Sequence, residues 1–222
     1  MGTLRGSAVR HLMDSATASR RPLKTRSAGW AQSTARYLSH TSITPNQISV
    51  ASVLAAASGS AALLLLHAPW SLLVCAVCIQ LRLLCNMLDG MVAVEGGKGS
   101  ATGALYNELP DRIADSLFIV SVGYAVLVPW LGWCSALLAA LTAYIRATGA
   151  ALGLPQDFRG PMAKPQRMAV LTAGCLLGSV EQLIWQSHVV LLAAESVVGA
   201  GSLLTCVTRT HAIARQLRSR AA

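Results

Sequence analysis

Five of the nine acidic residues of this chain fall within 27 positions near its middle. Asn86 and Asp89 lie three positions apart, so on a helix they would share a face. Asn107, Asp111 and Asp115 recur every four positions and would form one stripe on a second helix. Carboxylate and amide oxygens from two facing helices suit a hard divalent cation, Mg²⁺ or Mn²⁺, that holds a phosphate. The spacing therefore predicts metal-assisted chemistry on a phosphate group.

Composition shows where these residues must work. The chain has 222 residues, of which 54% are hydrophobic and 12% are charged. A soluble domain usually keeps about a quarter of its residues charged, and a disordered chain needs low hydrophobicity and high charge. The net charge of +9 comes with only 5% aromatic residues, which favours a membrane over a nucleic acid as the partner. We expect an integral membrane protein in contact with lipids and no nucleic-acid partner.

Six segments are apolar and long enough to cross a bilayer, which takes about 20 residues in a helix. They lie at 47–66, 70–94, 111–131, 132–154, 168–186 and 188–208. The predicted fold is all-α, an integral membrane bundle of six transmembrane helices that forms a catalytic domain over residues 44–208. A short connection joins the second and third helices, so their polar stripes are expected to face each other.

The basic residues are distributed unevenly around these spans. Of 18 Lys and Arg residues, only Arg82 lies well inside a span, and none lies in the three short connections on the opposite side. The positive-inside rule therefore predicts that both termini and the polar cluster are cytoplasmic. The opposite side carries four tryptophans, as expected for an interfacial aromatic belt: Trp70, Trp130, Trp133 and Trp185.

The two ends of the chain are basic. Residues 1–29 are rich in Arg, Ser and Thr with a single acid, which predicts a disordered cytoplasmic tail; a cleaved organellar targeting segment is the alternative. Residues 30–43 are expected to form an interfacial helix that dips Trp30 and Leu38 into lipid. Residues 209–222 form a second basic cytoplasmic tail.

The acidic cluster also has a simpler interpretation. Arg82 and Arg112 could neutralise the acids as ion pairs at helix ends. The small residues Gly90, Ala93 and Gly103 favour a ligand site, because they would let a ligand approach the backbone closely. Acids within a bilayer are costly, so they are a functional hypothesis by default.

The same residues resemble the signature of the CDP-alcohol phosphatidyltransferase family, D-x-x-D-G-x-x-A-R, eight residues, then G-x-x-x-D-x-x-x-D. The chain reads N-M-L-D-G-M-V-A-V over 86–94 and G-A-L-Y-N-E-L-P-D over 103–111, with the same spacing. The segment T-P-N-Q-I-S at 44–49 is similar to a P-N-x-I-T/S element of the family. Asn86 and Asn107 stand where the signature has acids, and Val94 stands where it has Arg. Glu95, Glu108 or Asp115 could supply compensating charge.

The resemblance implies an enzyme of phospholipid synthesis in a bacterial inner membrane, working as a homodimer. It would transfer a phosphatidyl or related phospho-alcohol group from a CDP-linked lipid to an alcohol and release CMP, with Mg²⁺ or Mn²⁺ as cofactor. Asp111 is implied as the general base. The implied metal ligands are Asp89, Asp111, Asn86, Asn107 and Asp115. The implied CDP contacts are Asn46, Asn86, Gly90, Ala93, Gly103 and Asn107.

Basic residues near the end of the fourth span suggest a pocket for a phosphate on the acceptor. They are Tyr144 with Arg146, Arg159, Lys164 and Arg167. The alternative is that these are ordinary inside-facing charges in contact with lipid headgroups.

Two other functions remain open. A homologue lacking two acids could bind a CDP-lipid without catalysis. A small transporter would need acids along a route across the bilayer, whereas here they cluster at one face. Glu181 and Glu195, toward the outer side, could be protonated, paired with a neighbour or part of a dimer contact.

Overall fold

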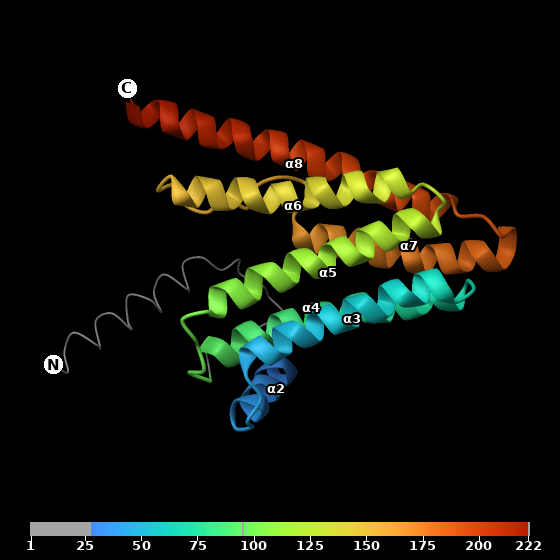
Figure 1. The fold of residues 1–222 in the computed structure, drawn as a ribbon, viewed down its shortest axis with the longest axis horizontal. Helices are drawn as coiled ribbons and strands as arrows, with labels where there is room; N and C mark the ends of the chain where they lie inside the picture. Colours follow the sequence, from blue (N-terminus) through green and yellow to red (C-terminus); the bar gives the residue numbers. More distant parts are fainter. Residues whose placement is uncertain (1–27, 95, 222) are drawn as a thin grey trace.

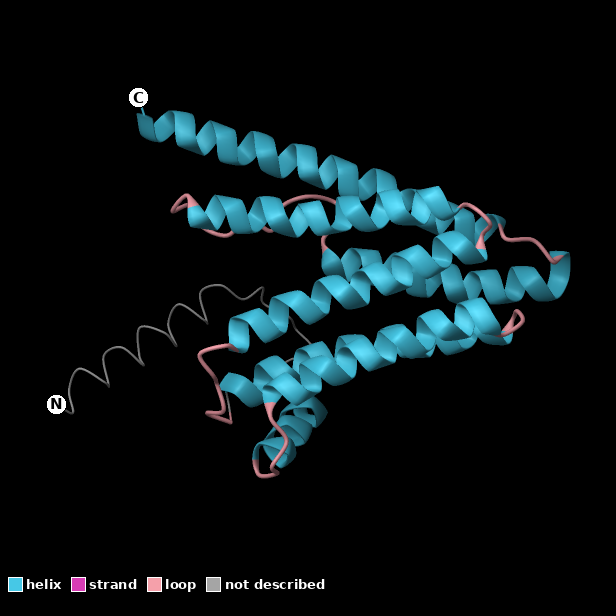
Figure 2. Cartoon of the chain, viewed as in Figure 1, coloured by secondary structure: helices cyan, strands magenta, loops and turns pink. Residues whose placement is uncertain are grey.

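The structure is a computed structural model that describes residues 28–94 and 96–221. The predicted tail at 1–29 lies almost wholly outside these ranges, as does Glu95. Every regular element in the described ranges is a helix (Figure 2). The helices are α2 (Gly29–Ser39), α3 (Pro45–Leu65), α4 (Trp70–Val94), α5 (Gly103–Ala125), α6 (Pro129–Ala151), α7 (Lys164–Trp185) and α8 (Val189–Ala221).

Helices α3 to α8 run along the long axis of the molecule, and the short α2 lies across one end (Figure 1). Helix α3 packs against α4 and α5, while α8 packs against α6 and α7. Contacts of α4 with α7 and of α5 with α6 join the two groups. The two helices that carry the signature are therefore bordered by α6 and α7.

Five of these helices are long and apolar enough to cross a membrane: α3, α4, α6, α7 and α8. This confirms an all-helical membrane protein within the described residues. Helix α5 is not among the five, because its first half carries the polar stripe of the signature. The predicted third span is thus a helix of sufficient length but mixed polarity.

Helix boundaries match the predicted spans closely at α4 and less well elsewhere. Helix α5 covers Gly103–Ala125 instead of 111–131, so the whole signature segment is helical. It ends early because Leu127 has a positive φ of 59° and Pro129 begins α6. Helix α8 continues to Ala221, so the predicted tail at 209–222 is almost wholly helical; it contains no Gly or Pro to end a helix.

The connections differ in length at the two ends of the bundle. Both long connections, of which the structure describes 96–102 and 152–163, lie at the end that also carries α2 (Figure 1). The short connections lie at the other end, next to Trp70, Trp130 and Trp185, all of which are exposed. This is the grouping that the basic residues and the tryptophans predict.

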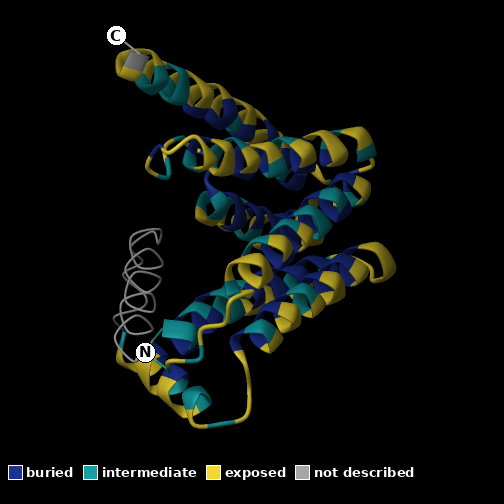
Figure 3. Cartoon of the chain, turned by 60° about the vertical axis from the view of Figure 1, so that its left-hand side comes forward, coloured by how far each residue is buried: buried dark blue, intermediate teal, exposed yellow. Residues whose placement is uncertain are grey.

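The core lies where the six long helices meet, and the buried residues lie on their inner faces (Figure 3). Phe118, Ile79, Leu171 and Val198 are fully buried there. Helices α5 and α6 cross at Gly123, where an added Cβ would lie 2.6 Å from a backbone atom of α6. Small residues at such crossings let membrane helices pack closely.

Helix α2 occupies most of the predicted interfacial segment 30–43 and ends at Ser39. Its Ala31 and Ala35 are buried against α4, while Trp30 and Tyr37 are exposed. The ammonium of Lys98 donates hydrogen bonds to carbonyls at the end of α2 and in the following turn. These bonds tie α2 to the connection between α4 and α5.

The structure also shows the partners of Glu181. Its carboxylate accepts hydrogen bonds from the backbone N–H groups of Val189 and Val190, each at 2.9 Å, and from Ser187. Glu181 therefore caps the start of α8, where a negative charge is favourable. Glu195, by contrast, is fully buried within α8.

Candidate active site

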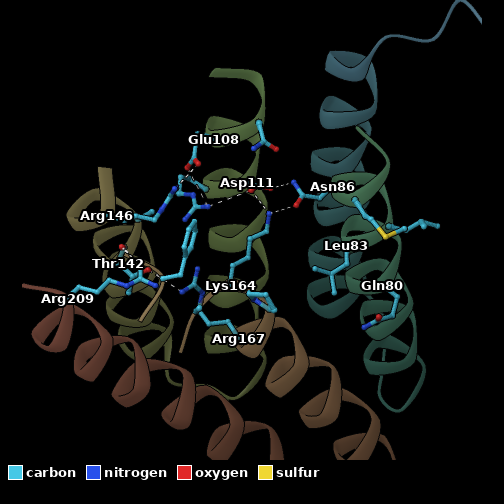
Figure 4. Close-up of a pocket in the computed structure, with 18 of the residues that line it drawn as sticks. Gln80, Leu83, Asn86, Glu108, Asp111, Thr142, Arg146, Lys164, Arg167 and Arg209 are labelled. Atoms are coloured by element: carbon cyan, nitrogen blue, oxygen red, sulfur yellow. Dashed lines mark hydrogen bonds and ion pairs between the residues drawn. The ribbon is translucent and has the colours of Figure 1, made fainter. Parts of the chain in front are cut away.

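A cavity of about 630 Å³ lies at the end of the bundle that carries the long connections (Figure 4). Its volume is in the range that binds small ligands. Its wall comes from all the long helices except α3, together with Trp30 of α2. The polar and charged residues in this wall are Gln80, Asn86, Asn107, Glu108, Asp111, Arg112, Thr142, Arg146, Lys164, Arg167 and Arg209.

Asp111 stands at the centre of the polar contacts in this wall. Its Oδ1 accepts hydrogen bonds from Asn86 Nδ2 at 2.6 Å and from Arg82 Nη2 at 3.1 Å. Its Oδ2 accepts from the ammonium of Lys164, and a guanidinium nitrogen of Arg112 lies 3.7 Å away. The carboxylate thus faces three positive charges, and the predicted proton acceptor is already hydrogen-bonded on both oxygens.

Asp115 lies one turn further along α5 and is buried. Its Oδ1 accepts from Arg82 at 2.6 Å, and its Oδ2 accepts from Arg167 at 3.0 Å. Both guanidinium groups are almost completely excluded from solvent. The predicted metal role of Asp115 does not match this arrangement, because arginines occupy both oxygens. The ion pairs considered as the simpler interpretation therefore form at Arg82, which bridges Asp111 and Asp115.

Asp89 and Asn86 share the inner face of α4 but have different surroundings. Asp89 is buried behind the cavity wall, where its Oδ2 accepts a hydrogen bond of 2.5 Å from the hydroxyl of Ser49 on α3. Asn86 lines the cavity and accepts a hydrogen bond of 2.6 Å from Lys164 at its Oδ1. Asn107 also lines the cavity, from the more exposed first turns of α5.

These contacts decide how a divalent cation would fit. In the described ranges, no three His, Cys, Asp or Glu side chains are grouped so as to hold a metal. No side chain there donates to Oδ1 of Asp89. With the amide oxygen of Asn86 and Oδ2 of Asp111, this oxygen gives a donor set of the hard type that Mg²⁺ and Mn²⁺ prefer. The oxygens of Asn86 and Asp111 already accept hydrogen bonds from the ammonium of Lys164. These residues therefore fit a divalent cation only if the cation and Lys164 can both contact the two oxygens.

Positive charge dominates the wall of the cavity. Five basic side chains line it, against two acids. The basic residues are Arg112, Arg146, Lys164, Arg167 and Arg209. Arg146 is held by an ion pair of 2.6 Å with Glu108 and by Gln156, and it lies over the ring of Phe158. Such a surface attracts anions, and several guanidinium groups together favour a phosphate.

Arg209 and Arg112 were not predicted as pocket residues. Arg209 comes from α8 beyond the predicted sixth span; its guanidinium donates to the carbonyls of Thr142 at 2.6 Å and Arg159 at 2.8 Å. A signal existed in the sequence, since Glu195, Ser202, Thr205 and Arg209 recur at helical spacing and form a buried stripe. That periodicity continues through residue 208 and predicts a longer helix.

The connection between α6 and α7 positions Lys164. Gly160 has a φ of +110°, and a Cβ there would lie 2.5 Å from Thr205 on α8. The next turn is held by a hydrogen bond of 3.0 Å from the N–H of Met162 to Thr205 Oγ1. Lys164 begins α7 directly afterwards and reaches across the cavity to α4 and α5 (Figure 4).

Several predicted site residues lie outside the cavity wall. Tyr144 is exposed, and the side chain of Arg159 is largely exposed where it forms an ion pair with Asp157. The others outside the wall are Asn46, Asp89, Gly90, Ala93, Gly103 and Asp115. The predicted acceptor group is thus reduced to Arg146, Lys164 and Arg167.

Comparison with known proteins decides the family. The chain is 32% identical over 188 residues to archaetidylinositol phosphate synthase from Aeropyrum pernix, an alignment covering 85% of this chain and 92% of that protein. The chain belongs to the CDP-alcohol phosphatidyltransferase family. This confirms the predicted family and, with it, the prediction of a transferase of phospholipid synthesis. No protein-family model matches the chain.

Two further relatives of this transferase family agree. Phosphatidylinositol phosphate synthase from Mycobacteroides abscessus is 31% identical over 140 residues, which span 58% of this chain and 59% of that protein. The crystal structure of Mycobacterium tuberculosis phosphatidylinositol phosphate synthase with CDP-DAG bound has a TM-score of 0.70 and 24% identity, covering 84% of this chain and 94% of that one. Another structure of that enzyme is a complex with manganese and citrate.

Proposed function

We propose that this transferase uses a phosphorylated alcohol of the inositol phosphate class as its acceptor and a CDP-linked lipid as its donor. The observation that carries the proposal is the basic wall of the cavity, where five Lys and Arg side chains surround one space beside Asp111. Because the wall has five basic side chains against two acids, it attracts an acceptor that carries a phosphate more strongly than one that does not. The names of the relatives from Aeropyrum and Mycobacteroides agree with this choice.

The part of the basic wall formed by Arg167 and Arg209 is the proposed subsite for the phosphate of the acceptor. Arg167 and Arg209 are held rigidly by the carbonyl oxygens of Met162 and Thr142, so they are pre-organised for an anion. A charge-assisted hydrogen bond to a phosphate contributes about 1.5–3 kcal/mol. Arg146, already paired with Glu108, would set the edge of this subsite.

Asp111 is the proposed proton acceptor for the attacking hydroxyl. Arg82 and Asn86 donate hydrogen bonds to its Oδ1. The other oxygen, Oδ2, is bonded to Lys164 and is the one proposed to accept the proton. When anionic substrates enter, the ammonium of Lys164 can move to a phosphate oxygen and release Oδ2 for the proton. A carboxylate within hydrogen-bond reach of the hydroxyl is the geometric requirement for general-base catalysis.

The proposed cofactor is one or more Mg²⁺ or Mn²⁺ ions. When bound, such an ion offsets negative charge on the phosphoryl oxygens. Asp89, Asn86 and Asp111 would hold it, with Asn107 as a further amide oxygen. The remaining predicted CDP contacts, at Asn46, Gly90, Ala93 and Gly103, are proposed on the resemblance to the signature alone.

A non-catalytic CDP-lipid-binding homologue is the second candidate. It is favoured by the hydrogen bonds on both oxygens of Asp111 and by the two amides at signature acid positions. The transporter receives less support, because the paired acids lie at one end of the bundle.

One assay separates these functions. The purified full-length chain is given CDP-diacylglycerol, Mn²⁺ and, in separate reactions, inositol phosphate, inositol or glycerol phosphate, and CMP release is measured. We expect metal-dependent CMP release that is fastest with inositol phosphate and is lost in Asp111→Asn. Release that is fastest with inositol would remove the acceptor proposal. No release with any acceptor, or equal release from Asp111→Asn, would favour the non-catalytic homologue.

We also propose the arrangement in the membrane. Helix α5 serves as a sixth span, α2 lies in the interface through Trp30, and both termini and the cavity face the cytoplasm of a bacterial inner membrane. The support is that, in the described part of the chain, both long connections lie at one end, with the basic residues of 152–167, while exposed Trp70, Trp130 and Trp185 lie at the other. A homodimer is proposed from the family resemblance.

A further inference from the structure

The ammonium of Lys164 lies inside the cluster of oxygens that the signature would use for a metal. It donates to Oδ1 of Asn86 at 2.6 Å and to Oδ2 of Asp111 (Figure 4). Lys164 comes from α7, on the opposite side of the cavity from the two signature helices, and its side chain is mostly buried. The lysine therefore places one positive charge between the amide oxygen of Asn86 and the carboxylate of Asp111.

The negative charges around this position are already balanced. Asp89, Asp111 and Asp115 contribute three negative charges, and Arg82, Lys164 and Arg167 contribute three positive ones, joined to them by four ion pairs. Arg112 adds a further positive charge 3.7 Å from Asp111. The signature would have two more carboxylates, at the places of Asn86 and Asn107. With those acids absent, little negative charge remains to hold several divalent ions.

We propose that the ammonium of Lys164 is a built-in cation that takes the place of one divalent ion, so that this chain binds a single Mg²⁺ or Mn²⁺. The inference rests on the proposed metal-dependent function and specifies its site. The amide of Asn86 fits this role, because an amide oxygen accepts from an ammonium without adding charge. Lysine is also suitable, since its ammonium is a compact charge with three donors.

The experiment measures Mn²⁺ binding to the full-length chain in detergent, without donor or acceptor, by the loss of the free-ion EPR signal. We expect one Mn²⁺ per wild-type chain. Lys164→Met removes a positive charge beside the remaining oxygens, so the dissociation constant for Mn²⁺ should fall at least tenfold. The double variant Lys164→Met/Asn86→Asp should bind a second ion.

Three variants serve as controls. Lys164→Arg keeps the charge and should keep one ion with affinity near that of the wild type. Lys98→Met removes a lysine from the same end of the bundle and should leave Mn²⁺ binding unchanged. In the described part of the chain, the hydrogen bonds of Lys98 go to carbonyls of α2 and the turn after it. Melting temperatures in EDTA show that each variant is folded; if Lys164→Met unfolds, Lys164→Gln makes the same comparison.

Three results would each overturn the inference. The wild-type chain could bind two ions, or it could bind none. Alternatively, folded Lys164→Met, or Lys164→Gln in its place, could bind Mn²⁺ no more tightly than the wild type. Two bound ions, or an affinity that does not rise, are results distinct from a failure of the proposed function, because no lipid or acceptor is present. The absence of any bound ion would also contradict the proposed metal dependence. A chain that binds one Mn²⁺ as expected but releases no CMP would keep the role of Lys164 and reject the transfer activity.

Discussion

Replacing Asp115 by Asn tests whether this residue anchors the buried arginines or binds a metal. The substitution keeps the shape of the side chain and removes the charge that Arg82 and Arg167 share, at 2.6 Å and 3.0 Å. Both guanidinium groups are almost fully buried, and in the described part of the chain Nε and Nη1 of Arg82 have no hydrogen-bond acceptor, so its bonds to the protein go through Nη2. An arginine left without its counter-charge in such a place cannot turn to water.

The expected loss of stability follows from these contacts. Removing one partner of a buried ion pair costs about 3–5 kcal/mol. Arg82 keeps its contact with Asp111, so we expect the lower end, about 3 kcal/mol. For a chain of this length, that corresponds to a melting temperature lower by roughly 6–12 °C. Because the loss arises from ion pairs within the protein, it should appear equally with EDTA present.

The assay is thermal unfolding of the detergent-solubilised protein in EDTA, followed by Mn²⁺ titration. Arg218→Met, which removes a charge from an exposed position of α8, is the control, because substitutions of exposed surface residues usually change stability by no more than about 0.5 kcal/mol. A melting temperature equal to that of the wild type in EDTA, together with much weaker Mn²⁺ binding, would refute the anchoring role. That result would restore Asp115 as a metal ligand, as the spacing on α5 predicts.

Other predictions concern the acceptor subsite, the connection before α7 and the cofactor. Arg209→Met should raise the KM for inositol phosphate about tenfold or more, the loss of a charge-assisted hydrogen bond, while Arg215→Met, on an exposed position of α8, should leave the KM unchanged. Equal KM values would remove Arg209 from the subsite. Gly160→Ala should lower the melting temperature and kcat/KM together, because its Cβ would lie 2.5 Å from Thr205 and its φ is +110°; an unchanged protein would show that the connection adapts. Removing divalent ions with EDTA should stop CMP release, and added Mn²⁺ should restore it; CMP release that continues in EDTA would contradict a metal-dependent reaction.

The sequence predicted the overall arrangement because two strong signals agree. Apolar length located the spans, and the distribution of basic residues and tryptophans separated the two ends. The helical spacing of Asn86 and Asp111 also predicted that the two stripes face each other, and the structure joins them by a hydrogen bond of 2.6 Å. These features depend on local periodicity, which a single sequence displays directly.

The contacts that were missed depend on which helices become neighbours. Nothing local to Lys164 shows that it reaches Asn86, 78 positions earlier in the chain. The spacing of Asp115 places it on the stripe predicted to bind a metal. In the structure, however, Arg167 from α7 forms an ion pair with its Oδ2, which gives Asp115 a different role. Arg209 joined the pocket because α8 is longer than the bilayer requires. A charged residue in a bundle is therefore assigned a role only once its cross-helix partner is known.

The same ion pairs explain how a polar helix can lie among apolar ones. Alone, α5 is too polar to qualify as a span, since its first half presents Asp111 and Asp115. Arg82 from α4 neutralises both, and Arg167 from α7 completes the pairing of Asp115. Ionised side chains within a bilayer are tolerated when they pair with one another inside the bundle. The acids therefore need arginines that α5 does not carry, and a sixth span at α5 would form only together with α4 and α7.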